Sequence, residues 1–225
     1  MAEYRIGDIH EEIKKIPENS IDLCYTNPPF ATTKKKWDIP LRWEELFIEL
    51  DRVVKPNGVI LIHTAIPFTY ELISIKKPKY HYIWIKNNAT NFFQAKKQPL
   101  RQVEEILVYY KNAHTYNPQM IGDKKMYHER NNSYQGNQYY GNQKPNVSNH
   151  TGKYPTTYLG SFTRILQKNS PKSVNDQIIK RMIKTYSNEN DCILDMTCCD
   201  KGVGNIATQL NRKYIGIDIS DEYLN

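Results

Sequence analysis

The sequence predicts an α/β fold with three layers, in which helices cover both faces of a doubly wound, mostly parallel sheet. Two observations lead to this prediction. Short apolar runs of strand type alternate along the chain with segments whose apolar residues recur every three or four positions, and this alternation is typical of parallel sheets. The chain also has 225 residues, which is enough for one full core with a sizeable insertion.

The first predicted strand covers residues 21–26 and stops at Asn27-Pro28-Pro29-Phe30, because two successive prolines cannot donate to a sheet ladder. A helix is expected next, since one apolar face is formed by Trp43, Leu46, Phe47, Leu50, Val53 and Val54. Pro56-Asn57-Gly58 ends this helix. Further strands are expected at residues 59–62, 82–85 and 106–110.

From about Lys111 to Gly160 the periodic apolar residues vanish, and Asn, Gln, Tyr, Lys, His and Gly dominate. Irregular structure is expected over this stretch. Regular elements return with a helix around residues 178–183, a strand at 192–195, a helix around 206–210 and a strand at 214–218.

Composition narrows the class of protein. No run approaches the 18 apolar residues of a membrane span and no secretory signal is recognisable, so a cytoplasmic protein is expected. Neither zinc nor disulfide spacing is found among Cys24, Cys192, Cys198 and Cys199, and the histidines lack metal-ligand spacing, so reduced thiols and no metal are expected. The 31 Lys and Arg against 24 Asp and Glu give a net charge of +7, which favours a polyanionic partner without selecting one.

The tetrapeptide Asn27-Pro28-Pro29-Phe30 carries the chemistry. It follows a parallel strand, where ligands of open α/β sheets bind. Two acceptors, the Asn27 side-chain carbonyl and the Pro28 backbone carbonyl, suit the two protons of an exocyclic base amine and favour a nucleophilic nitrogen. Phe30 offers a face for an extruded base. A plain turn is the alternative for the tetrapeptide alone.

Several segments in this order resemble DNA adenine-N6 methyltransferases of the permuted (beta) type, above all phage and prophage members. The segments are Gly7-Asp8, Ile16–Leu23, Thr26–Phe30, Lys36-Trp37-Asp38, Lys86–Thr90, Lys96–Arg101 and Tyr214–Ser220. The resemblance implies a Rossmann-like methyltransferase fold with circularly permuted motif order. It places a catalytic half with the base pocket at residues 1–110, a target-recognition insertion at 111–160 and a cofactor-binding half at 161–225.

The resemblance also implies the activity: transfer of a methyl group from S-adenosylmethionine to adenine N6 in double-stranded DNA, with the base flipped out of the helix. Asn27, which stands where the family more often has Asp, and Pro28 would hold the amine, while Pro29 and Phe30 complete the motif. The cofactor would be surrounded by Asp8 at its adenine ring, Asp218 at its ribose hydroxyls, Asp195 and Thr197.

The sequence departs from the family in the cofactor loop, where Cys199 and Lys201 replace two glycines that let the backbone pass under the cofactor. Lys201 would bring positive charge toward a sulfonium, although Gly202 and Gly204 could give the loop another path. Upstream, Lys168–Val174 keeps only fragments of a family stretch that lines the same pocket. Cys198 and Cys199 are interpreted as small packing residues, because no histidine is near them in sequence.

These departures leave a second hypothesis open: a catalytically inactive subunit that binds DNA or pairs with an active relative. Family members often form dimers, so a homodimer and a heterodimer are both open. An RNA methyltransferase is a third hypothesis, which rests on the same pocket.

Contacts to DNA are expected from basic and aromatic residues. Lys34, Lys35 and Lys36 follow the base motif and are assigned to phosphates, with a solvated run as the alternative. Lys96, Lys97 and Arg101 are assigned to DNA as well. The insertion interleaves tyrosines, Tyr139 and Tyr140 among them, with Lys, Arg, Asn and Gln, a mixture that favours base recognition over a plain surface.

Overall fold

The computed structural model describes residues 2–130, 134–137, 141–143, 146–162 and 174–222. The chain divides into two compact units, one formed by Met1–Asn117 and Thr157–Asn225 and the other by Pro118–Thr156. Tyr139, Tyr140 and residues 168–173 lie outside the described residues, and so do the expectations that concern them.

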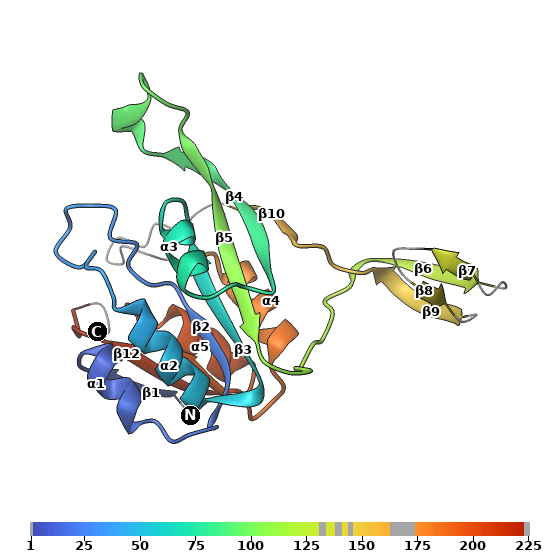
Figure 1. The fold of residues 1–225 in the computed structure, drawn as a ribbon, viewed down its shortest axis with the longest axis horizontal. Coiled ribbons are helices and arrows are strands. Elements are labelled where there is room, and N and C mark those ends of the chain that lie inside the picture. The colour runs from blue at the N-terminus through green and yellow to red at the C-terminus, as the bar shows by residue number, and fades with distance from the viewer. Residues whose placement is uncertain (1, 131–133, 138–140, 144–145, 163–173, 223–225) are drawn as a thin grey trace. The chain divides into compact units, whose positions relative to one another are not determined.

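An eight-stranded sheet forms the centre of the larger unit (Figure 1). Its strands are β1 (Ala2–Ile6), β2 (Ile21–Thr26), β3 (Val54–Thr64), β4 (Tyr80–Thr90), β5 (Arg101–Tyr110), β10 (Tyr158–Phe162), β11 (Cys192–Asp195) and β12 (Lys213–Asp218). They lie in the order β1-β12-β11-β2-β3-β5-β4-β10, and β5 runs antiparallel to both its neighbours while the other pairs are parallel. The predicted mostly parallel sheet is confirmed.

Helices cover both faces of this sheet, as the three-layer prediction requires. One face carries α1 (Ile9–Glu12), the 3-10 helix η1 (Ile13–Lys15), α2 (Trp43–Val53) and α3 (Phe68–Ile75), and the other carries α4 (Asp176–Tyr186) and α5 (Gly202–Gln209). Side chains of β2 alternate between the two cores: Leu23 and Tyr25 belong to the α4 side, and Ile21 and Cys24 to the α2 side. Both cores therefore share one sheet.

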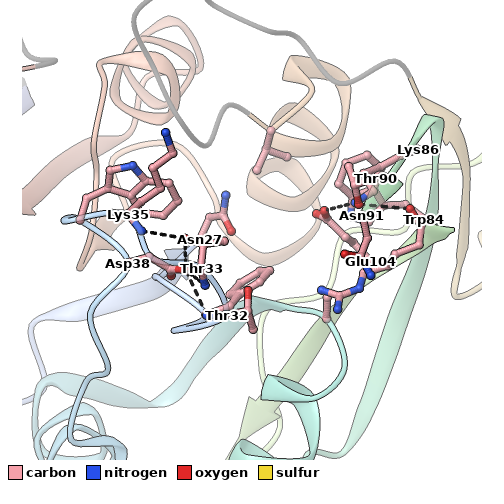
Figure 2. A pocket seen from close by; sticks show the side chains of 15 residues that line it. Asn27, Thr32, Thr33, Lys35, Asp38, Trp84, Lys86, Thr90, Asn91 and Glu104 are labelled. Atoms are coloured by element: carbon pink, nitrogen blue, oxygen red, sulfur yellow. Dashed lines mark hydrogen bonds and ion pairs between the residues drawn. The ribbon is translucent and has the colours of Figure 1, made fainter. Parts of the chain in front are cut away.

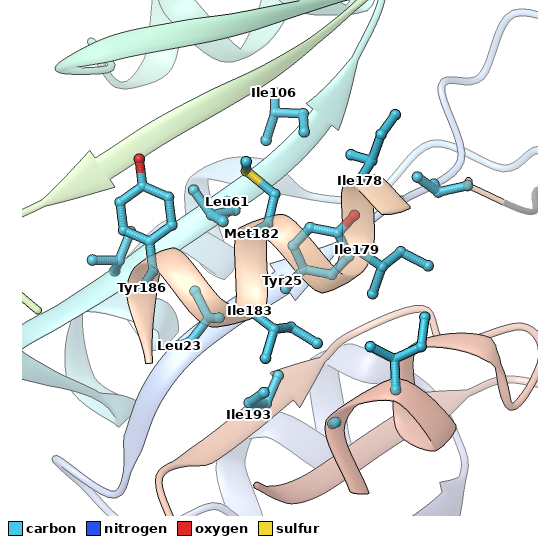
Figure 3. Close-up of a cluster of buried hydrophobic side chains, with 14 of the residues drawn as sticks. Leu23, Tyr25, Leu61, Ile106, Ile178, Ile179, Met182, Ile183, Tyr186 and Ile193 are labelled. Atoms are coloured by element: carbon cyan, nitrogen blue, oxygen red, sulfur yellow. The ribbon is translucent and has the colours of Figure 1, made fainter. Parts of the chain in front are cut away.

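The amphipathic helices predicted from sequence supply these cores. In α2 the buried residues are Trp43, Leu46, Phe47, Leu50 and Val53. In α4 the apolar face packs on the sheet, as Figure 3 shows for Ile178, Ile179, Met182 and Ile183 beside Leu23, Tyr25, Leu61, Ile106 and Ile193. The Asn175 side chain caps α4 by accepting a hydrogen bond from Gln177 N.

A tyrosine at the end of α4 ties this helix to β4. The Tyr186 hydroxyl lies 2.7 Å from the Tyr80 hydroxyl and 2.6 Å from the Tyr82 hydroxyl. Tyr186 and Tyr82 are buried, and burial raises the pKa of the Tyr80 hydroxyl to about 12. The three hydroxyls therefore satisfy one another as neutral groups.

The smaller unit corrects one expectation. Part of the stretch predicted to be irregular forms an antiparallel ribbon of β6 (Ile121–Arg130) and β9 (Asn146–Lys153), with a second pair, β7 (Tyr134–Asn137) and β8 (Gly141–Gln143). Most described side chains of β6 and β9 are exposed. A ribbon with little buried surface needs no apolar alternation, which is why the sequence pattern did not predict it.

Other elements were not predicted either, namely β1, α1, α3 and β10. Since β10 pairs with β4, residues 157–160 belong to the larger unit although they were expected within the insertion. No disulfide links the four cysteines, all of which are described. Among the described residues, no helix is long and apolar enough to cross a membrane.

Candidate active site

The predicted site residues meet at one edge of the sheet. Asn27 follows β2, Asp195 ends β11, Asp218 ends β12, and Asp8 comes two residues after β1. These strands are parallel, so their carboxyl ends share an edge. A hydrogen bond of 2.8 Å from Gly7 N to the Asp218 carbonyl joins the ends of β1 and β12.

A cavity of about 300 Å³ opens beside Asp218 and Asp8. The Asp218 carboxylate accepts hydrogen bonds from Cys199 N at 2.8 Å and Ser220 N at 3.1 Å, and Asp8 accepts one from His10 N at 2.9 Å, which caps α1. Apolar walls complete the cavity, with Ile9, Ile39, Pro40, Leu41, Met196 and Ile219. We call it the nucleoside cavity, after the cofactor nucleoside that the sequence resemblance predicts beside Asp8 and Asp218.

The loop between β11 and α5 contains two unusual residues, Cys199 and Lys201, which have different surroundings. Cys199 has a φ of +51°, a left-handed backbone that favours glycine, and it belongs to the wall of the nucleoside cavity. Lys201 is exposed at the N-terminus of α5 and belongs to the wall of none of the cavities found among the described residues. The chain turns into α5 at Gly202, and the expectation that Lys201 brings positive charge toward the cofactor stays a prediction.

Asp195 lies deeper than its expected role suggests. It is 2% exposed and accepts a hydrogen bond from Thr197 N at 3.2 Å, while the Tyr214 hydroxyl lies 3.4 Å from it. Burial, together with the smaller effect of the nearby charges of Asp218 and Asp200, raises the pKa of the Asp195 carboxyl to about 7. Asp195 contributes to the wall of a small cavity of about 30 Å³.

The loop from Ala31 to Asp38 is held by one buried carboxylate. Asp38 accepts hydrogen bonds from the backbone nitrogens of Ala31, Thr32 and Thr33 at 2.8, 3.0 and 2.7 Å, and from the Thr33 hydroxyl at 2.7 Å. We call residues 31–38 the clamped loop. Trp37, next to Asp38, belongs to the walls of both the nucleoside cavity and a larger neighbour.

The larger neighbour is a cavity of about 430 Å³, which we call the base cavity. Figure 2 shows Asn27 and the clamped loop on one side of it and residues of β4 and β5 on the other. Lys86 in β4 is 2% exposed, and its ammonium donates to Glu104 at 2.8 Å and to Thr90 Oγ1 at 3.3 Å. Nε1 of Trp84, in the same wall, is buried and has no hydrogen-bond partner among the described residues.

Asn27 is the residue common to all three cavities. In the rest of its motif, Pro28 is buried, Pro29 contributes to the nucleoside cavity, and Phe30 contributes to the base cavity. The Phe30 ring stacks on the buried ring of Phe68 with centroids 5.2 Å apart. The prolines and this stacking fix the direction of the motif.

The basic residues assigned to DNA are separated by the fold. Lys35 contributes to the base cavity and Lys36 to the nucleoside cavity, while Lys34 is exposed. Arg101 contributes to the base cavity, and Lys96 and Lys97 are exposed in the connection between β4 and β5.

Sequence reasoning assigned no role to Lys86, Glu104 or Trp37. A signal for Lys86 was present, because Tyr82, Trp84 and Lys86 recur at the two-residue period of a strand face, and all three are buried. A lysine in that series indicates a buried charge with a partner. The partner itself depends on the pairing of β4 with β5, where Trp84 lies opposite Glu104.

Comparison with known proteins identifies a family and several relatives. The family described as DNA methylase matches residues 21–225. DNA adenine methyltransferase YhdJ of Escherichia coli (strain K12) is 30% identical over 97% of this chain and 78% of its own length. Type II methyltransferase M.HpaI of Haemophilus parainfluenzae is 27% identical over 94% of this chain and 68% of its own length.

Solved structures share the fold. A complex of M1.HpyAVI with SAM has a TM-score of 0.64 at 18% identity, covering 99% of this chain and 95% of that chain. The cytosine-N4-specific PvuII DNA methyltransferase has a TM-score of 0.69 at 15% identity, covering 99% and 83%. The resemblance noted in the sequence and the Rossmann-like fold class are thereby confirmed. The chain belongs to the DNA methylase family.

Proposed function

We propose that this chain transfers a methyl group from S-adenosylmethionine to the N6 amine of an adenine turned out of double-stranded DNA. The observation that carries the proposal is the position of Asn27, which belongs to the walls of both the nucleoside cavity and the base cavity. A group that binds the accepting amine must lie where donor and acceptor meet.

The nucleoside cavity has the chemistry that S-adenosylmethionine requires. Carboxylates such as Asp218 accept hydrogen bonds from ribose hydroxyls, and Asp8 can accept one from the amine of the adenine ring. The apolar walls formed by Ile9 and Ile39 suit the faces of that ring. When bound, this cofactor supplies an electrophilic methyl group on a sulfonium.

Thr197 and Asp195 have distinct parts in this proposal. Thr197 contributes to the nucleoside cavity, and its hydroxyl lies 3.0 Å from that of Thr26 at the end of β2. Asp195 is a positioning residue, because its carboxyl accepts a hydrogen bond from Thr197 N and so orients the loop. The β11 loop is thereby joined to the strand that precedes Asn27.

The proposed chemistry takes place at the amine. The Asn27 side-chain carbonyl and the Pro28 backbone carbonyl accept its two protons, so the nitrogen lone pair is directed away from the ring and can attack the methyl group. The Phe30 ring, which stacks on Phe68, packs against the base at the edge of the base cavity. In this proposal the base cavity is the pocket for the target base. DNA binding and methylation are proposed to occur in the cytoplasm.

Adenine is the proposed target because YhdJ is named a DNA adenine methyltransferase and because Asn27 stands where the permuted adenine enzymes have an acidic or amide residue. Residues 118–156 are proposed as the target-recognition unit. Five of its residues are Lys or Arg and two are Asp or Glu, counted from the sequence, so the unit carries positive charge that favours phosphate contacts.

One observation favours a second candidate function, an inactive subunit that binds DNA or pairs with an active relative. The Cys199 side chain occupies part of the wall where the sequence pattern of the family has none. This candidate predicts DNA binding without cofactor binding.

Isothermal titration with S-adenosylmethionine separates the two candidates, and Asn27→Ala tests the mechanism. We expect the unaltered chain and the Asn27→Ala variant to bind the cofactor in the micromolar range. Methyl transfer to unmethylated plasmid DNA should fall roughly 100-fold or more in Asn27→Ala, the usual effect of losing one oriented group that stabilises a transition state. Asn27→Asp keeps an acceptor oxygen and should retain most of the activity.

Chromatography of the digested product identifies the methylated base. N6-methyladenine supports the proposal, and N4-methylcytosine contradicts the choice of adenine. The absence of heat in the cofactor titration would favour the inactive subunit.

A further inference from the structure

The connection between β4 and β5 exposes two adjacent phenylalanines to solvent. Phe93 is 103% exposed and Phe92 is 66% exposed. No other large apolar side chain among the described residues is as exposed as Phe93. Single exposed apolar residues are common, but two neighbouring aromatic side chains at a projecting turn indicate a contact surface.

The backbone of this connection is ordered by its own hydrogen bonds. Asn91 has a φ of +73° and precedes the 3-10 helix η2 (Phe92–Gln94). Further turns follow, because the backbone nitrogens of Ala95 and Lys97 donate to the carbonyls of Phe92 and Gln94 at 3.1 and 2.8 Å. Figure 1 shows β4 and β5 extending beyond the rest of the sheet to this tip. The turn itself presents the two rings.

The charges around the rings are positive. Lys96 and Lys97 are exposed in the same connection, and Arg101 begins β5. The sequence has no Asp or Glu from residue 87 to residue 103. A surface of aromatic rings surrounded by cations suits a polyanion that offers stacking faces, which describes a nucleic acid better than an acidic protein surface.

The tip also continues the wall of the base cavity. Thr90, Asn91 and Arg101 line that cavity, and Phe92 follows Asn91 directly in the chain. DNA whose base enters the base cavity must therefore bring its neighbouring base pairs close to Phe92 and Phe93. Extruding a base breaks its stacking on both sides, and apolar side chains inserted between base steps compensate for such losses.

We propose that Phe93, supported by Phe92, inserts into duplex DNA at the gap left by the extruded target base, while Lys96 and Lys97 contact the flanking phosphates. We call Phe92 and Phe93 the wedge. This inference rests on the proposed function, because it requires a base in the base cavity. The wedge would explain how the duplex is opened, which the residues of the base motif do not explain.

Single-stranded DNA provides the test, since it has no duplex to open. The variant is Phe92→Ala combined with Phe93→Ala, and the control is Ile48→Ala, which removes a side chain that is 70% exposed on α2. Initial rates of tritium transfer from S-adenosylmethionine are measured on unmethylated plasmid DNA, native and heat-denatured. We expect the wedge variant to lose roughly 10- to 100-fold on native DNA and less than about twofold on denatured DNA. The control should change neither rate.

Three outcomes would overturn the wedge. An equal loss on native and denatured DNA would show that the phenylalanines do not act in opening the duplex. Unchanged rates on both substrates would show that they do not contact DNA. A dimer of the unaltered chain that becomes a monomer in the variant, with equal losses on both DNAs, would identify a self-association surface instead.

A binding measurement keeps this inference separate from the proposed function. If the unaltered chain transfers no methyl group to either DNA, the methylation proposal fails, but the wedge still predicts a preference in binding. We expect the unaltered chain to bind a duplex with one abasic site roughly 10-fold more tightly than the intact duplex, and the wedge variant to lose this preference. Equal affinity of the unaltered chain for the two duplexes would overturn the wedge.

Discussion

Cys199 and Lys201, for which the resemblance predicts glycines, lie in one loop but have different surroundings. Cys199 adopts a left-handed backbone that costs a residue with a side chain about 1–2 kcal/mol, and it lines the nucleoside cavity. Lys201 is instead exposed where α5 begins, and it lines none of the cavities found among the described residues. The two substitutions should therefore differ in their effect on cofactor binding.

Cys199→Gly should strengthen S-adenosylmethionine binding by roughly 5- to 30-fold. It removes a side chain that would crowd the bound cofactor, and relief of about 1–2 kcal/mol of crowding corresponds to that factor. Isothermal titration measures the change. Lys201→Gly is the matched control and should alter the affinity by less than about twofold. A larger effect of Lys201→Gly than of Cys199→Gly would contradict the loop geometry.

Individual site residues could be predicted where a sequence pattern fixes both their identity and their place. Asn27, Asp195 and Asp218 follow apolar strands, and strand ends in a parallel sheet share one edge. Glu104 could not be predicted in the same way. Its pairing with Lys86 depends on the register between β4 and β5, which is a tertiary property.

The contact between α4 and β4 depends on polar groups as well as on the apolar core. Tyr80, Tyr82 and Tyr186 form a group in which Tyr186 bonds to both others, since its hydroxyl lies within 2.7 Å of those of Tyr80 and Tyr82. Removing this hydroxyl leaves Tyr82, which is buried, without the partner that Tyr186 provides. Unsatisfied buried hydroxyls cost about 1–3 kcal/mol.

Tyr186→Phe should accordingly lower the free energy of unfolding by about 1–3 kcal/mol. Urea denaturation followed by circular dichroism measures it. Tyr80→Phe is the comparison, because Tyr80 is only partly buried and Tyr186 keeps its bond to Tyr82 in that variant. It should cost less than Tyr186→Phe. The reverse order would show that Tyr186 is not the centre of the group.

The central strands were predictable because both their faces are buried. β2 and residues 59–62 of β3 read as apolar runs, and most residues of both strands are buried. The first part of β3 was predicted wrongly, because Val54 was assigned to the preceding helix and Pro56-Asn57-Gly58 to its end, whereas the strand begins at Val54. β1 and β10 are the outermost strands of the sheet, and all five residues of β1 are exposed or half-buried. Edge strands need fewer apolar residues, so their sequences give a weaker signal.

The division into two units separates the proposed cofactor and base binding from the proposed target recognition. The larger unit contains the sheet and all the cavities described, and its boundary residues are anchored to it. Asn117 N donates to the Thr185 carbonyl at 2.8 Å, and the Thr157 carbonyl accepts from Ile83 N at 2.9 Å. Residues 118–156 form a compact unit of their own. The larger unit should therefore fold without them.

Replacing residues 118–156 by a flexible Gly-Ser linker tests this separation. We expect the shortened chain to unfold cooperatively and to bind S-adenosylmethionine within about threefold of the full chain, because the nucleoside cavity lies in the larger unit. Methylation of plasmid DNA should fall at least roughly 100-fold, as recognition contacts are lost. Thermal unfolding, titration and tritium transfer measure the three properties. Retained methylation would contradict the recognition role.

The hydrogen bonds of Asp38 have a thermodynamic consequence. Three backbone nitrogens and one hydroxyl converge on this carboxylate, so we expect any displacement of the clamped loop to involve these residues together. Trp37 belongs to the walls of two cavities, and an occupant that shifts the loop in one cavity reshapes the other. Such linkage is reciprocal: each occupant changes the affinity for the other by the same factor. If the two cavities bind donor and substrate as proposed, Asp38 should make the two binding steps cooperative.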